Sequence, residues 1–135
     1  MFRGVLFCEC CGHPLMISKK KLDDRQEDIY VCMYHYSQPE LCPKTHQVYH
    51  EMLSSYVLQQ IQKLAKSMKR RRINSPIKEY VLIENLSTTI INEVIDRIEV
   101  GHLCILFCFR FMCQRSILFV QVCVLVHQMQ QIKAV

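Results

Sequence analysis

The chain has 135 residues, nine cysteines and a formal net charge of +5. This length holds one ordinary domain or a small module with a tail, and the charge is mild for a protein that binds nucleic acid over much of its surface. No apolar stretch of signal-peptide length precedes the first cysteines. We therefore expect a reducing compartment, where clustered cysteines bind metal more often than they form disulfides.

A Cys-x-x-Cys-Gly motif near the N-terminus indicates half of a metal site. Cys8 and Cys11 are spaced so that two thiolates on a tight turn reach one Zn²⁺ at about 2.3 Å. Gly12 lets the backbone turn back without a side-chain clash. Cys32 and Cys42 supply the other half, and a site closed by four protein ligands is structural, not catalytic. The sequence predicts structural zinc held by these four cysteines.

Neighbouring residues leave alternatives for the ligand set. Cys10 lies between the first two ligands and would point away from the metal as a spare thiol. His46 follows Cys42 closely enough to replace it, and His13 and His35 are weaker alternatives. The chain has no Gly-rich phosphate loop, no H-E-x-x-H motif and no convincing serine nucleophile beside a base. We therefore expect no catalytic residues and no enzymatic activity.

The first 46 residues read as a ribbon of short strands at 5–7, 15–17 and 29–31. Between the last two strands, a polar hairpin places basic residues on one limb and acidic residues on the other. A segment this small buries too little apolar area to fold without a metal or disulfides. We expect residues 1–46 to form a zinc ribbon that depends on its metal.

Helical periodicity follows over residues 47–72, with apolar residues at Leu53, Val57, Ile61, Leu64 and Met68. Residues 73–86 are predicted to be a linker. Ser87 suits the N-cap of a second helix within 87–102, which ends in the start of a strand. The predicted class is α+β: a zinc ribbon of short antiparallel strands, an amphipathic helix, a second short helix and an apolar C-terminal tail.

Two clusters of basic side chains are candidates for contact with phosphate groups, where charge neutralisation releases counterions. They comprise Lys19, Lys20 and Lys21 in the hairpin, and Lys69, Arg70, Arg71 and Arg72 at the end of the long helix. The second cluster also complements the dipole of its helix. We therefore expect the hairpin lysines to contribute more to phosphate contact. The alternative is that both clusters are solvated surface.

Three segments together resemble the zinc beta ribbon of large serine recombinases. They read F-R-G-V-L-F-C-E-C-C-G-H-P-L, I-Y-V-C and L-C-P-K-T-H, and a helix follows them. A later segment, I-E-N-L-S-T-T-I-I-N-E-V-I-D-R-I-E-V-G, is similar to the part of the family that follows the ribbon, so the resemblance covers residues 2–102. It implies DNA binding, with Cys8, Cys11, Cys32 and Cys42 as metal ligands. His46 matches a histidine that follows the last cysteine in the family, and we count it as a candidate DNA contact.

The family's catalytic domain, with its serine nucleophile, has no counterpart in this sequence. We therefore expect a DNA-binding fragment of a bacterial, cytoplasmic recombinase from a mobile element, with DNA and a full-length recombinase subunit as partners. The alternative function is a protein-interaction module that pairs with a partner subunit through the ribbon and the amphipathic helix. Salt dependence separates the two, because only DNA binding should weaken steeply with salt.

Residues 103–135 form an apolar tail in which Arg110, Arg115 and Lys133 are the formal charges. Two central arginines make a membrane span marginal, so we do not expect a membrane partner. Alternating Ile105, Phe107, Phe109 and Phe111 fit strands of an ordinary domain. The composition and the family pattern break at the same place, which favours an aberrant end of a truncated gene. On that interpretation the tail is dispensable to the ribbon.

Overall fold

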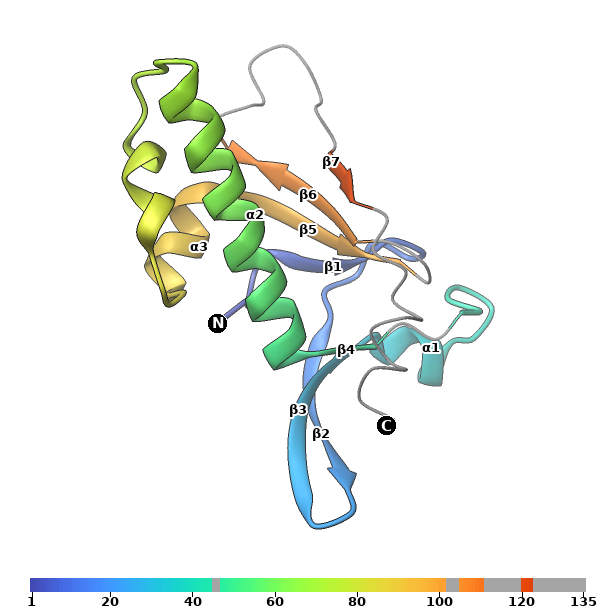
Figure 1. The fold of residues 1–135 in the computed structure, drawn as a ribbon. Helices are drawn as coiled ribbons and strands as arrows, with labels where there is room; N and C mark the ends of the chain where they lie inside the picture. The colour runs from blue at the N-terminus through green and yellow to red at the C-terminus, as the bar shows by residue number, and fades with distance from the viewer. Residues whose placement is uncertain (45–46, 102–104, 111–119, 123–135) are drawn as a thin grey trace.

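The computed structural model describes residues 1–44, 47–101, 105–110 and 120–122. Its helices and strands follow the order β1 (Leu6–Cys8), β2 (Met16–Leu22), β3 (Arg25–Val31), α1 (Met33–Ser37), β4 (Gln47–Tyr49), α2 (His50–Arg70), the 3-10 helix η1 (Pro76–Leu82), α3 (Thr88–Val94), β5 (Ile95–Val100), β6 (Ile105–Phe109) and β7 (Val120–Val122). The predicted α+β class is confirmed (Figure 1).

Strands β2, β3 and β4 form a three-stranded antiparallel sheet. The polar stretch between the predicted strands continues the hairpin, so that Lys19 pairs with Asp28 across the ladder and Leu22 with Arg25. Asp23 closes the turn with φ 47°, in the left-handed region that aspartate tolerates better than most residues. The expected division into a basic and an acidic limb is confirmed, and the hairpin projects from the body of the molecule (Figure 1).

A second sheet joins the two ends of the chain in the order β1-β5-β6-β7. Strand β1 lies parallel to β5, with Leu6 opposite Ile98, whereas β6 is antiparallel to both β5 and β7. Helix α2 lies across one face of this sheet (Figure 1). Its Leu53, Val57 and Ile61 are fully buried, in the same core as Ile98. The ribbon and the C-terminal segment therefore share one hydrophobic core.

Strand β6 corrects the expectation of a detached apolar tail. Ile105 and Phe107 are fully buried and Phe109 is 3% exposed, while Leu106 between them is half-buried. This alternation is the period of a strand that packs one face on the core, which confirms the strand interpretation for residues 105–109. These residues are part of the fold, so we expect them to contribute to its stability. The remainder of the tail lies outside the described residues, apart from Arg110 and β7.

No helix in the described part of the chain is long and apolar enough to cross a membrane.

The segment expected to be a linker contains η1, which packs against α2. Ile77 of η1 is fully buried, and Gln62 on α2 donates a hydrogen bond from Nε2 to the Ile83 carbonyl at 2.8 Å. Ser87 accepts a hydrogen bond from the Ile90 N–H at 3.2 Å, as predicted for an N-cap. Strand β5 begins at Ile95, earlier than the sequence indicates, because pairing with β6 extends back to that residue.

Helix α2 ends in a tight reversal that places an arginine where glycine is usual. The Ile73 N–H donates to the Met68 carbonyl at 3.0 Å, and the Arg72 N–H donates to the Lys69 carbonyl at 3.2 Å. This pair of hydrogen bonds defines a Schellman motif, whose residue after the C-cap adopts a left-handed conformation. Arg72 has φ 56°, and an arginine in this conformation costs about 1 kcal/mol relative to glycine.

Replacement of Arg72 by glycine should stabilise the protein by about 0.5–1 kcal/mol, because glycine adopts this conformation without strain. The matched control is Arg71→Gly. Arg71 has φ −81°, so glycine there gains nothing and loses about 0.5–1 kcal/mol through chain entropy. Urea denaturation of the two variants tests the assignment, and equal effects of both replacements would contradict it.

Candidate metal centre

Four cysteine thiols converge from three places in the chain. Cys8 ends β1, Cys11 follows in the next turn, Cys32 follows β3 directly, and Cys42 lies in the loop beyond α1. Their four Sγ atoms all lie within 4.8 Å of one another. The separation is 3.6 Å between Cys8 and Cys42 and 3.4 Å between Cys11 and Cys32. The structure thus brings together the four residues that the sequence predicts as ligands.

This donor set fits a tetrahedral ion. Zinc–thiolate bonds of about 2.3 Å place the sulfurs of a regular tetrahedron about 3.8 Å apart, close to the separations found here. Cys8, Cys32 and Cys42 are buried and Cys11 is half-buried, so water has little access to the centre. Four thiolates are the donor set of a closed structural zinc site. Cys10 is exposed and lies outside the group of four.

A short turn positions Cys8 and Cys11. The Gly12 N–H donates to the Cys8 carbonyl at 2.8 Å, and the Cys8 N–H donates to the His13 carbonyl at the same distance. Gly12 has φ 73°, a conformation that disfavours any residue with a Cβ. The role expected of this glycine is confirmed.

The second pair is held by α1 and the loop that follows it. Cys32 is the N-cap of α1, and the Cys42 N–H approaches the Gln38 carbonyl at 3.4 Å. His35 donates from Nδ1 to the Cys42 carbonyl at 2.8 Å. His13 stacks on Tyr34 with ring centroids 3.7 Å apart. Neither histidine belongs to the group of four donors, and the alternative donor His46 lies outside the described residues.

Burial shapes the acidity of the thiols. Desolvation raises the pKa of Cys8 to about 11 and raises the pKa of Cys42 strongly as well. Burial also raises the pKa of Cys32, but the nearby His35 N–H and the Cys11 and Cys42 thiols outweigh it, and the net shift is downward. A metal ion must displace thiol protons to bind. Its affinity therefore falls as the pH falls.

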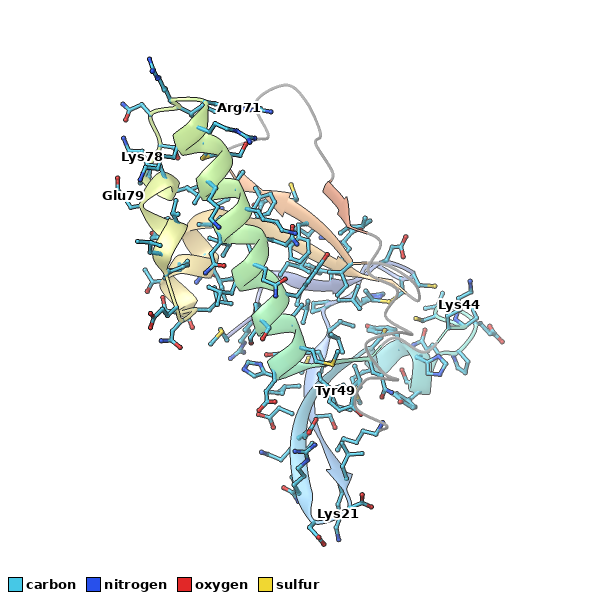
Figure 2. All side chains as sticks on the ribbon, viewed as in Figure 1. Lys21, Lys44, Tyr49, Arg71, Lys78 and Glu79 are labelled. Atoms are coloured by element: carbon cyan, nitrogen blue, oxygen red, sulfur yellow. The ribbon has the colours of Figure 1, made fainter. Side chains whose placement is uncertain are left out.

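The hairpin lysines lie among carboxylates. Lys19 Nζ is 3.2 Å from Asp28 Oδ1, and Arg25 forms a second ion pair with Glu27 at 3.1 Å. Lys20 lies 5.7 Å from the centre of the Tyr49 ring. Lys21 is exposed near the tip of the hairpin (Figure 2). From residue 16 to 31 there are four basic and four acidic side chains, so the hairpin carries no net charge.

The basic cluster at the end of α2 has a different surrounding. Lys69, Arg70, Arg71 and Arg72 are all exposed, and within the described residues none of them belongs to an ion pair. A shallow cleft of about 410 Å³ opens beside them, lined by Lys69, Arg72, Ile73, Asn74, Lys78 and Glu79. Lys78 and Asn74 were not among the predicted phosphate contacts, although both lie close in sequence to the basic cluster.

Comparison with known families places the metal centre in a recognised domain. Residues 1–62 match the family model of the recombinase zinc beta ribbon domain, and all four clustered cysteines lie within that range. No curated protein and no solved structure shows significant similarity to the chain. The N-terminal part of this chain is a zinc ribbon similar to the recombinase zinc beta ribbon domain, and it contains four cysteines that could hold one metal ion.

Proposed function

We propose that this chain binds DNA as the zinc-ribbon part of a serine site-specific recombinase. The observation that carries the proposal is the convergence of four cysteine sulfurs within 4.8 Å, inside the range that matches a recombinase ribbon. Zinc is the ion that four thiolates in this arrangement favour. It would tie together the end of β1, the end of β3 and the loop beyond α1, and so hold the base of the hairpin.

Binding, without strand cleavage, is the proposed role of these residues. Four protein donors leave a zinc ion no open position for water or substrate, which supports a structural role for the metal. Exposed lysines and arginines offer contacts to phosphate oxygens that do not depend on base sequence. Cutting and joining of DNA would then require a catalytic serine from a recombinase subunit.

The alternative, a module that pairs with a partner through α2, requires a free apolar face on that helix. In the structure this face packs in the core of the same chain, where Leu53, Val57 and Ile61 are fully buried. Tyr56 also contacts Phe107 of β6, with ring centroids 5.6 Å apart. These contacts favour DNA binding over helix pairing as the proposed function.

The zinc-loaded full chain should bind a 30-base-pair duplex with micromolar or weaker affinity, about the range of non-specific binding. A chain that makes a few phosphate contacts should lose affinity steeply between about 50 and 200 mM salt, because each contact contributes about 0.9 to the logarithmic slope. Fluorescence anisotropy at several salt concentrations measures the slope, and the recovered duplex should be free of nicks. Salt-independent binding, nicked DNA or no binding would contradict the proposal.

A further inference from the structure

Cationic side chains from two elements gather at the end of α2 farthest from the metal centre. We call Lys69, Arg70, Arg71, Arg72 and Lys78 the cationic corner. The Schellman motif reverses the chain after α2, and η1 then returns Lys78 to the same end of the molecule (Figure 2). From residue 69 to 79 there are five basic side chains and one acidic side chain. Residues 69–79 therefore carry a net charge of +4, whereas the hairpin carries none.

Its charges are available for a ligand, in contrast to two of the four cations in the hairpin. Within the described residues, Lys19 and Arg25 in the hairpin form ion pairs, whereas no member of the cationic corner does. A phosphate that contacts Lys19 must compete with Asp28 at 3.2 Å. At the corner, Glu79 is the one carboxylate among the described residues that lines the cleft with Lys69 and Lys78.

The backbone of Arg72 gives a second indication. A left-handed residue after a helix C-cap is most often glycine, yet the position with φ 56° holds arginine. No described contact of this side chain within the chain offsets the conformational cost. A backbone outlier of this kind is a reason to look for a functional role of the side chain.

We propose that the cationic corner is the main phosphate-contacting surface for duplex DNA, an inference that rests on the proposed function. Guanidinium groups of the corner arginines suit paired hydrogen bonds to phosphate oxygens. Lys69, Lys78 and the Asn74 amide border the cleft of about 410 Å³ where a phosphate group fits. This order reverses the expectation that the hairpin lysines contribute more, because the structure pairs Lys19 and Arg25 of the hairpin with carboxylates.

The corner and the ribbon would contact different parts of a duplex. Helix α2 has 21 residues, and at 1.5 Å per residue it separates its two ends by about 30 Å. That length approaches one turn of B-DNA, about 34 Å. One phosphate cannot be shared between the two surfaces.

Two matched triple variants of the full chain test the inference. One carries Arg71→Gln, Arg72→Gln and Lys78→Gln; the other carries Lys19→Gln, Lys20→Gln and Lys21→Gln. The corner variant should lose about tenfold or more in affinity for a 30-base-pair duplex near 100 mM salt and lower the logarithmic salt slope by about two to three. The hairpin variant should lose about threefold or less. Equal zinc content and circular dichroism establish that both variants are folded.

Removal of the negative charge in the cleft adds an independent measurement. Glu79→Gln should tighten duplex binding by about twofold to threefold, because it removes the carboxylate that lines the cleft in the described part of the chain. A hairpin variant that loses as much affinity as the corner variant, or an unchanged corner variant, would overturn the inference while leaving the proposed function intact. Corner-dependent binding of poly-glutamate without corner-dependent binding of duplex would assign the surface to an acidic protein instead. A wild-type chain that binds no duplex would overturn the proposed function itself.

Discussion

Replacement of Cys32 by serine should release the metal and unfold the ribbon. Structural zinc contributes about 10 kcal/mol or more to folding in small zinc modules near neutral pH, which is comparable to the whole stability of a domain of this size. The loss should be large because the ribbon's metal site links segments that pack in the common core. Metal analysis should give one zinc per wild-type chain and none in the variant, with loss of the cooperative thermal transition.

The control is Cys10→Ser. Cys10 is exposed and does not belong to the four-thiol group, so this variant should keep one zinc and an unchanged transition temperature. The comparison requires the full chain, because β1 of the ribbon pairs with β5 near the other end of the chain. Full zinc content in Cys32→Ser would rule out the four-cysteine centre.

Replacement of Phe107 by alanine should destabilise the protein by about 3–5 kcal/mol, the range for a phenylalanine-to-alanine substitution that leaves a cavity in a core. Phe107 is fully buried and its ring contacts those of Tyr56 and Phe109, with centroids 5.6 and 6.1 Å away. Truncation after residue 102 should have a still larger effect, because it removes β6 entirely. Urea denaturation measures both.

Leu106→Ala is the matched control for Phe107. Leu106 is its neighbour on β6 and is half-buried on the opposite side of the strand, so its replacement should cost about 1.5 kcal/mol or less. A truncated chain that keeps the wild-type unfolding midpoint would show that β6 does not support the core.

Features set by local sequence were predictable. The spacing of Cys8 and Cys11, closed by Gly12, determines a turn over a few residues, and the hairpin limbs are adjacent in the chain. Likewise, the apolar period of α2 identifies its buried face, and Ser87 forms its cap with the next turn. Each of these depends on interactions between near neighbours.

Features set by long-range packing could not be predicted from the sequence. The parallel pairing of Leu6 with Ile98 joins distant segments, and no local pattern specifies it. In sequence, the break in composition after Gly101 favours an aberrant tail over a buried strand, and the strand becomes evident only from the position of Phe107 in the core. Gln60 of α2 is 6% exposed, although its polar side chain would suit the solvent-facing side of the helix.

Charge posed a related difficulty. The sequence shows that Lys19, Lys20 and Lys21 are adjacent, but the ladder that places Lys19 opposite Asp28 depends on where the hairpin turns. The approach of Lys78 to the end of α2 depends on the Schellman reversal and on η1. The sequence therefore identifies clusters of basic side chains, but only the three-dimensional structure shows which of them pair with carboxylates.

X-ray absorption at the zinc edge, on the full chain loaded with one zinc, tests the four-cysteine ribbon most directly. Four sulfur neighbours at about 2.3 Å and no nitrogen neighbour are the expected result. A nitrogen neighbour at about 2.0–2.1 Å would contradict it, because one of the four cysteines would then have been replaced by a histidine such as His46.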